Sequence, residues 1–341
     1  MKITAVLKSI ALCSIFTLLA GSAMAELSII GSGASFPAPI YTTWFKEFSR
    51  ANQGIQINYQ AKGSGAGVRD FLDHTVDFAA SDAAMTPEDM AKVSEGVQLL
   101  PMTAGEIVLS YNLKEVKELK LSREAYVGIF SGTIKKWNDA KIAKANPGAK
   151  LPDQEITVVS RADSSGTNFV FTQHLSAISP EFAKAPGFGN TVNWPETMKM
   201  VKAPKNDGVA ATIKQTPGAI GYIEYGFAVM SKSPMASLEN KAGKFVAPGL
   251  EGGQAALANA VLPENMIAWI TDPAGDKSYP IATYTWMIFY NKYADAAKAD
   301  ALRKMVTYCL DKGQKVADKA GYIPLPANVV EKVRKASANI Q

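Results

Sequence analysis

The chain has very little cysteine and histidine, with two residues of each among 341. Cys13 lies in an apolar segment near the N-terminus, so the rest of the chain holds only Cys309, and one thiol cannot form an internal disulfide. His74 and His174 are far apart in the sequence, and no HExxH or clustered ligand spacing exists. We therefore expect a fold held by its hydrophobic core, two structural histidines, and neither a metal nor a cofactor.

Recognisable catalytic motifs are also missing. The sequence has no Gly-x-Ser-x-Gly, no Cys–His partnership and no Gly-x-x-x-x-Gly-Lys-Ser/Thr loop. A strong charge of one sign is absent too, because the net charge is only +5 and the basic residues are scattered. These features argue against an enzyme and against a nucleic-acid partner.

The first 25 residues have the three parts of a secretory signal. Lys2 and Lys8 form a charged start, residues 10–20 are almost unbroken apolar, and Ala23 and Ala25 make a small-x-small cleavage site. A retained membrane anchor is the alternative, but the apolar run is shorter than the roughly 20 residues needed to cross a bilayer. We expect cleavage after Ala25 and export of the mature chain, in which no later stretch approaches a membrane span.

Short β-rich runs alternate with helical ones through the rest of the chain. The strand-like runs are residues 55–59, 106–111, 156–160, 220–223 and 283–290, and residues 76–82 form a short buried strand ending in Ser81 and Asp82. Helices are expected after Pro37 and Pro39, after residues 63–67 and after residues 163–166. This alternation predicts an α/β architecture.

Three short segments rich in small and hydroxyl side chains each lead into a helix. They are GSGASF at residues 31–36, GSGAG at 63–67 and RADSSGT at 161–167. The first turn of a helix carries unpaired backbone N–H groups and the positive end of the helix dipole, and can bind an anion. For the first two segments alone, plain N-caps are the competing interpretation.

The third segment is more specific, because Arg161 precedes Asp163 and the hydroxyls of Ser164, Ser165 and Thr167. A guanidinium offers several donors in a rigid fork suited to a tetrahedral oxyanion, and a nearby carboxylate can hold that fork in place. The alternative is a surface Arg–Asp pair beside an N-cap.

Asp82 looks misplaced beside an anion, since like charges repel. An ionised carboxylate can only accept hydrogen bonds, so it suits a ligand that still carries a proton. Phosphate near neutral pH is protonated on one or two oxygens, whereas sulfate has no proton to give. Asp82 would therefore admit phosphate and reject sulfate by leaving a buried charge unpaired.

At these residues the sequence strongly resembles the phosphate-binding proteins of bacterial ABC-type phosphate import systems. The resemblance is carried by segments spread over the mature chain, namely GASFPAPIY, NYQAKGSGAGV, TVDFAASDA, GTIKKWND, SRADSSGTNFVFT, PGAIGYIEY and YIPLPANVVEKV. The resemblance implies a type II periplasmic-binding-protein fold: two α/β lobes joined by two crossing strands, with the ligand cleft between them. The implied lobes are residues 26–107 plus 284–341 and residues 108–283.

The resemblance also assigns roles in phosphate binding. In the first turn it implies a hydroxyl from Ser35 and a backbone N–H from Phe36, and in the second turn a hydroxyl from Ser64. It makes Asp82 the proton-accepting carboxylate and Arg161 the cationic partner, oriented by the carboxylate of Asp163. The donors of the third turn would be Ser165, Gly166 and Thr167. Two positions depart from the family pattern: Ser35 stands in place of Thr, and Ser164 in place of Gly.

The function implied is that of a monomeric periplasmic protein that captures inorganic phosphate and delivers it to the membrane permease of the importer. A binding protein for sulfate, molybdate or a phosphonate, or a relative used in adhesion or sensing, is the main alternative. Lys135, Lys136 and Trp137 could belong to a permease-facing surface, although a solvated loop with a half-buried Trp is the simpler interpretation.

Overall fold

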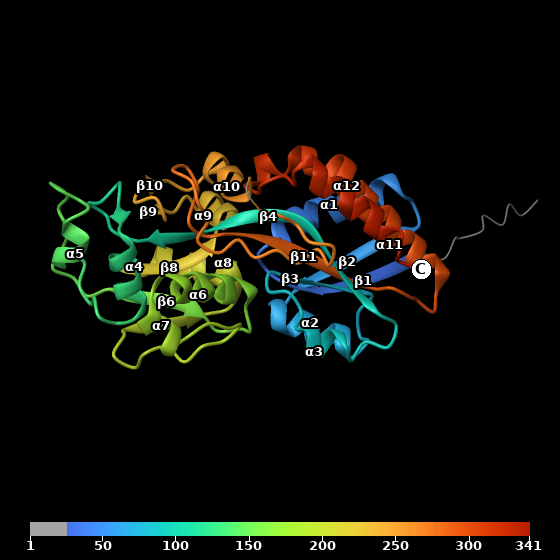
Figure 1. Ribbon diagram of the computed structural model, residues 1–341, viewed down its shortest axis with the longest axis horizontal. Helices are drawn as coiled ribbons and strands as arrows, with labels where there is room; N and C mark the ends of the chain where they lie inside the picture. The colour runs from blue at the N-terminus through green and yellow to red at the C-terminus, as the bar shows by residue number, and fades with distance from the viewer. Residues whose placement is uncertain (1–25, 259) are drawn as a thin grey trace, which may run out of the picture.

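The computed structural model describes residues 26–258 and 260–341. The expected signal segment, residues 1–25, and its cleavage site lie outside the described residues. Within the described part, none of the helices combines the length and the apolar character that a membrane crossing requires. Figure 1 shows two α/β lobes side by side, with the strands of a large sheet running through both.

The large sheet contains β1 (Leu27–Gly33), β2 (Ile55–Ala61), β3 (Phe78–Ser81), β4 (Val97–Tyr111), β6 (Thr157–Arg161), β7 (Met200–Ala203), β8 (Ala219–Glu224) and β11 (Ala282–Tyr290). A small sheet contains β5 (Lys120–Leu121), β9 (Ser237–Glu239) and β10 (Phe245–Val246). The helices are α1 (Ala38–Ala51), α2 (Ser64–Leu72), α3 (Pro87–Met90), α4 (Arg123–Phe130), α5 (Ala140–Ala143), α6 (Gly166–Ile178), α7 (Pro180–Lys184), α8 (Lys205–Gln215), α9 (Tyr225–Ser231), α10 (Leu250–Leu257), α11 (Ala296–Tyr308) and α12 (Ala327–Ser337), with a π turn and two 3₁₀ turns between α11 and α12.

The strand order in the large sheet is β2-β1-β3-β11-β4-β8-β6-β7. Strands β1, β2 and β3 are parallel to one another, as are β6, β7 and β8. Between them β11 is antiparallel to β3 and β4, and β4 is antiparallel to β8. The two parallel groups therefore point in opposite directions, and their carboxyl ends face each other at the middle of the molecule.

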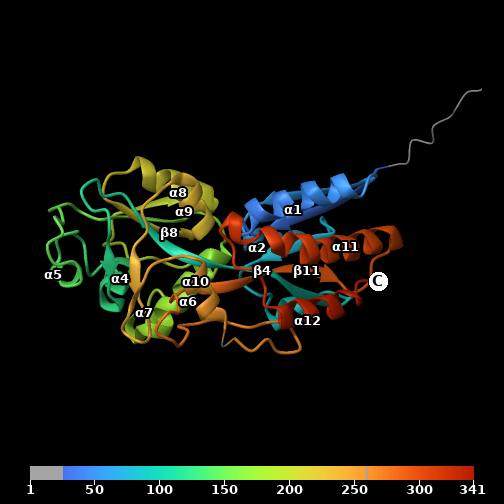
Figure 2. The ribbon, with the colours of Figure 1, turned by 90° about the horizontal axis from the view of Figure 1, so that it is seen from above.

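Strands β4 and β11 connect the two lobes (Figures 1 and 2). Residues 97–106 of β4 pair with β11, and residues 107–111 pair with β8, so one continuous strand belongs to both parts of the sheet. The expected strand at 106–111 is thus only the end of β4. The first part of β4 was not predicted because it contains Pro101, and proline disfavours a central strand. In the structure Pro101 lies at a register irregularity, opposite Trp286.

The helix predictions hold with shifted bounds. Helix α1 begins at Ala38, and Tyr41, Trp44, Phe45 and Phe48 recur on its buried face at helical spacing. Helix α2 begins at Ser64, so most of the 63–67 segment is its first turn rather than a preceding loop. These boundaries place backbone N–H groups directly at the lobe interface.

Trp137, outside this region, differs from expectation. Trp137 is completely buried rather than half-buried, and its indole N–H donates to the carbonyl oxygen of Gly218 over 2.9 Å. His174 is a buried residue, whereas His74 is half-exposed and pairs with Glu95. Trp137 is thus part of the core, and the side-chain partners of the two histidines, Glu95 and Tyr126, are not among the predicted site residues.

Candidate ligand-binding site

The predicted site residues lie where parallel strands end and helices begin. After β1 and before α1 come Ser35 and Phe36; Ser64 opens α2; Asp82 follows β3; Arg161 ends β6; and Asp163, Ser165, Gly166 and Thr167 lead into α6. Ligand sites in open α/β sheets characteristically form at such carboxyl ends. All of these residues except Asp163 are buried, and Asp163 is partly exposed.

Side chains from the two lobes contact each other directly here. Arg161 donates from Nη2 to Oγ of Ser35 over 3.3 Å. Ser64 Oγ accepts a 3.2 Å hydrogen bond from the backbone N–H of Asp82, and a Cβ added to Gly166 would lie 2.4 Å from that same Oγ and 2.8 Å from Cβ of Asp82. Only glycine at position 166 therefore allows α6 to approach the first lobe this closely.

Asp163 holds the guanidinium of Arg161. Nε of Arg161 donates to Oδ1 of Asp163 over 2.8 Å, and Nη2 donates to Oδ2 of the same carboxylate. Burial alone would raise the pKa of Asp163, but the hydrogen bonds and positive charge of Arg161 outweigh burial and lower it. The surface-pair alternative is wrong for Arg161, whose side chain is only 2% exposed.

One nitrogen of this guanidinium has an unmet hydrogen-bonding requirement. Among the described residues, Nη1 of Arg161 is buried and has no hydrogen-bond partner. A buried, charged N–H group without a partner is costly and uncommon in native proteins, and a bound ion is one of the arrangements that satisfy it. The fork is thus oriented by Asp163 on one side and can donate to an anion from the other.

The third turn supplies a more limited set of donors than its sequence suggests. Ser165 is the N-cap of α6: its Oγ accepts from the backbone N–H of Asn168 over 3.0 Å, while its own backbone N–H donates to the carbonyl oxygen of Asn190 over 2.9 Å. The hydroxyl hydrogen of Ser165 can still donate, together with the first-turn N–H groups of Gly166 and Thr167, which have no intrahelical acceptor.

Asp82 is the only carboxylate among the predicted site residues that is fully buried, at 1% exposure. Burial raises the pKa of Asp82 to about 7, while a hydrogen bond from Thr285 and the charge of Arg161 act in the opposite direction. Thr285 Oγ1 donates to Oδ1 of Asp82 over 2.8 Å. Sequence reasoning missed Thr285, because its position depends on how β11 pairs with β3 and β4.

Helix α8 also reaches the site, which was not foreseen. The backbone N–H of Lys205 donates to Oδ1 of Asp163 over 2.8 Å, and that of Asn206 donates to Oγ of Ser35 over 3.2 Å. Lys205 has a positive φ of 57°, an uncommon conformation for a non-glycine residue. Residues 200–207 lack Gly, Ser and Thr, and Pro204, just before the helix, was a local signal of its start.

Ser164 lies at the exposed rim between the lobes. Its carbonyl oxygen accepts a 3.1 Å hydrogen bond from the backbone N–H of Gly65 in α2. A Cβ on Gly65 would lie only 2.0 Å from Oγ of Ser164. The unusual serine at position 164 therefore packs against the opposing helix start, rather than among the buried donors.

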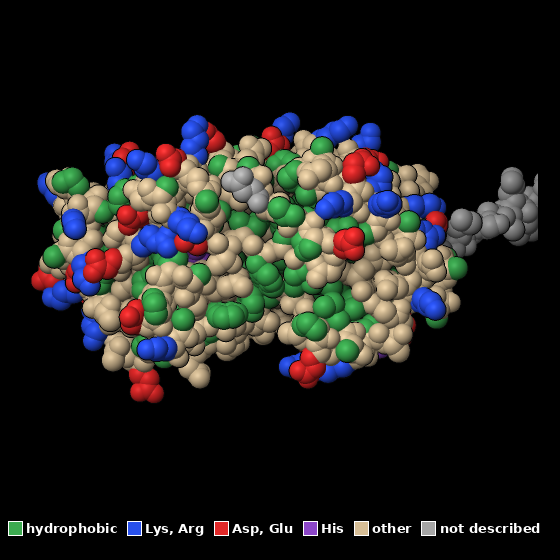
Figure 3. Space-filling model, in the orientation of Figure 1, with side chains coloured by type: hydrophobic (Ala, Val, Ile, Leu, Met, Phe, Trp, Pro, Cys, Tyr) green, Lys and Arg blue, Asp and Glu red, His purple; other side chains and the backbone are tan. Residues whose placement is uncertain are grey.

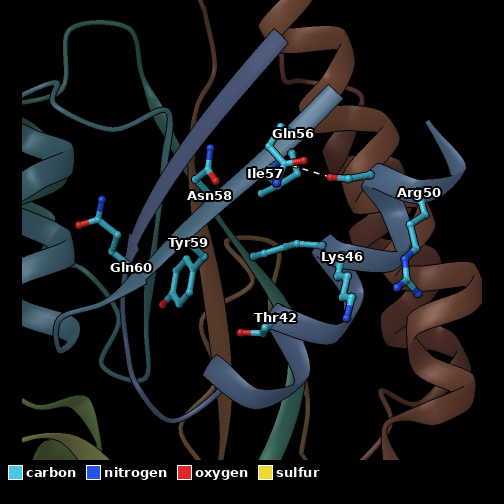
Figure 4. A pocket seen from close by; sticks show the side chains of 10 residues that line it. Thr42, Lys46, Arg50, Gln56, Ile57, Asn58, Tyr59 and Gln60 are labelled. Atoms are coloured by element: carbon cyan, nitrogen blue, oxygen red, sulfur yellow. Dashed lines mark hydrogen bonds between the residues drawn. The ribbon is translucent and has the colours of Figure 1, made fainter. Parts of the chain in front are cut away.

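A separate surface hollow lies on the outer side of edge strand β2. Figure 4 shows it between α1 and β2, with Lys46 and Arg50 on the helix side and Gln56, Asn58 and Gln60 on the strand side. Arg50 pairs with Glu47 and is mostly exposed. This hollow contains none of the predicted site residues and lacks the converging buried donors of the lobe interface.

Figure 3 shows basic and acidic side chains interspersed over one face of the described residues.

Comparison with known proteins places the chain in a family. A family model described as the PBP superfamily domain matches residues 20–311. The phosphate-binding protein PstS of Pasteurella multocida is 39% identical over 313 residues, which cover 90% of this chain and 89% of that protein. PstS of Methanocaldococcus jannaschii is 36% identical over 322 residues, covering 88% and 83% of the two chains.

Solved structures show the same fold. The high-affinity periplasmic phosphate-binding protein PfluDING, bound with phosphate, superposes with a TM-score of 0.75 at 22% identity, covering 91% of this chain and 93% of that one. A phosphate-binding protein from Stenotrophomonas maltophilia gives 0.74 at 23% identity, covering 90% and 93%. At these identities the likeness concerns the fold.

Two α/β lobes, joined by two crossing strands and meeting at helix N-termini, define a binding protein of the periplasmic type. The chain belongs to the PBP superfamily and, within it, to the family of the phosphate-binding proteins PstS. The resemblance stated from the sequence motifs is confirmed.

Proposed function

We propose that this protein captures inorganic phosphate between its two lobes in the periplasm and delivers it, as a monomer, to the membrane permease of an ABC-type phosphate importer. The observation that carries the proposal is the pairing of one buried acceptor, Asp82, with many buried donors from both lobes. The names of the PstS relatives and the expected signal segment support the same function.

The donor set suits a dehydrated tetrahedral anion. Ser35, Phe36 and Ser64 would bind it from the first lobe, and Arg161 from the second; Ser165, Gly166 and Thr167 would complete the second lobe's share. Asp163 would act through Arg161. Hydrogen bonds to an ionised ligand are roughly twice as strong as neutral ones, and exclusion of water strengthens them further.

Asp82 would decide which anion binds. Its carboxylate would accept the hydrogen of monobasic or dibasic phosphate, while fully ionised sulfate would face an unpaired negative charge. Binding without chemistry is proposed because Ser35 accepts hydrogen bonds from Arg161 and Asn206, which are not bases, and because both histidines lie elsewhere in the described part of the chain.

The proposed lobes are residues 26–107 with 284–341, and residues 108–283. Their movement about β4 and β11 would open the site to solvent and close it around the ligand. Closure would bring Gly166 of the second lobe against Ser64 and Asp82 of the first.

Calorimetric titration of ligand-stripped protein with phosphate and with sulfate tests this function. We expect tight binding of phosphate and weak or undetectable binding of sulfate. Tight sulfate binding would contradict the role given to Asp82. Release of phosphate from an ester, abolished by Arg161→Ala, would instead establish an enzyme.

A further inference from the structure

Asn206 is a completely buried amide placed between the lobes. From the start of α8, its Nδ2 donates to Oγ of Ser35 over 3.0 Å and to Oγ1 of Thr167 over 3.2 Å. Its backbone N–H also donates to Oγ of Ser35, over 3.2 Å. Two donors of a single residue thus converge on one hydroxyl that the phosphate proposal places in the first lobe.

The orientation of this amide is determined by its other end. Oδ1 of Asn206 accepts a 2.9 Å hydrogen bond from the backbone N–H of Glu224, at the end of β8. A backbone N–H can only donate, so the oxygen must face Glu224 and the NH₂ group must face Ser35 and Thr167. The reversed amide would place two donors against each other.

Three donors then point at Oγ of Ser35: Nδ2 and N of Asn206, and Nη2 of Arg161. A hydroxyl oxygen has two acceptor lone pairs and one hydrogen. With its acceptor capacity filled from the second lobe, Ser35 must direct its hydrogen away from these donors. The hydroxyl is thereby set as a donor, which is the role that an anion requires.

We propose that Asn206 is a positioning residue that fixes the Ser35 hydroxyl as a donor toward the bound anion and ties it to the second lobe. The inference rests on the proposed function, because Ser35 must contact the ligand. Asn206 itself acts through Ser35 and, by its second hydrogen bond, through Thr167. Its effect on affinity should therefore depend on the Ser35 hydroxyl.

A double-mutant cycle with phosphate titration tests this dependence. We expect Asn206→Ala to weaken phosphate binding about tenfold. This is the scale of losing one hydrogen bond that involves a charged group, here the bond from the Ser35 hydroxyl to the anion. In the Ser35→Ala background the same change should cost about threefold or less, because the hydroxyl that it positions is gone. Equal losses in both backgrounds, or no loss in either, would overturn the inference.

Two further variants separate positioning from folding. Asn206→Asp keeps an oxygen to accept from Glu224 but replaces the NH₂ group with an acceptor, so the Ser35 hydroxyl would turn toward it; we expect a larger loss than for Asn206→Ala, again reduced without Ser35. Asn240→Ala is the control, because Asn240 is equally buried and its amide bonds three backbone carbonyls elsewhere. It should lower the melting temperature but leave phosphate affinity unchanged.

The wild-type titration separates the two proposals. If the wild-type protein fails to bind phosphate, the proposed function fails and the role of Asn206 with it. If the wild type binds phosphate tightly while Asn206→Ala and Asn206→Asp bind equally well, only the role of Asn206 fails.

Discussion

Thr285 donates a 2.8 Å hydrogen bond to Asp82, and thereby joins crossing strand β11 to the buried carboxylate. This bond favours the ionised form of Asp82 against the effect of burial. Thr285→Val should raise the pKa of Asp82 further and weaken phosphate binding about tenfold, more at pH 6 than at pH 8. Titration calorimetry at both pH values measures this.

Thr283→Val is the matched control, since Thr283 is buried on the same strand and its hydroxyl donates to the carbonyl oxygen of Tyr284. Phosphate affinity should not change in this variant. An equal loss in both variants would mean that the strand, rather than the Asp82 contact, is responsible.

Asp82→Asn tests selectivity. The amide can donate a hydrogen bond, so it no longer leaves a negative charge unpaired beside sulfate. We expect the ratio of phosphate to sulfate affinity to fall by at least about tenfold, the scale of one charged hydrogen bond. Competition titrations of both anions measure it, and an unchanged ratio would reject the proton-acceptor role.

Asp82 should also make the stability of the ligand-free protein depend on pH. Its folded pKa of about 7 lies above the ordinary value of 3.8, so between these values the folded state binds more protons than the unfolded state. Stability from this group is therefore present at low pH and is lost as pH rises toward 7. Urea unfolding should show Asp82→Asn gaining stability relative to wild type from pH 4 to 7, with no further gain above; a constant difference would refute the shift.

Arg161→Ala should weaken phosphate binding by about 2–5 kcal/mol, the cost of removing one partner of a buried charged pair. Arg161→Lys should recover only part of this loss, because an ammonium lacks the fork held by Asp163. Arg123→Ala is the control: Arg123 makes a similar two-bond pair with Asp272 outside the predicted site. Calorimetry should show its affinity unchanged, and comparable losses at both arginines would point to a folding effect.

Gly65→Ala tests closure at the rim. Alanine favours the helix by about 1 kcal/mol, so the ligand-free protein should not be destabilised. The new methyl group would meet Oγ of Ser164 and obstruct the approach of the lobes. We expect weaker phosphate binding, restored in Gly65→Ala with Ser164→Gly; failure of the second change to restore affinity would show that the rim contact is not the obstacle.

Much of the fold and of the site could be predicted from local sequence. Small, hydroxyl-rich segments before helices indicated Ser35, Ser64 and Thr167 as candidates, because helix starts expose N–H groups whatever the tertiary context. Asn206 and Thr285 could not be found this way: their partners lie 171 and 203 residues away in the chain, at Ser35 and Asp82. The first nine residues of β4, 97–105, were not predicted because they contain a proline, which the pairing with β11 accommodates at a register irregularity.

The continuity of β4 has a mechanical consequence. Because its ladder passes from β11 to β8 between residues 106 and 107, tension on either half is transmitted along a single covalent and hydrogen-bonded ribbon. Such a ribbon resists stretching and shear far more than it resists bending. In the proposed opening and closing, β4 would therefore bend between the lobes, while its pairing with β11 on one side and with β8 on the other would persist.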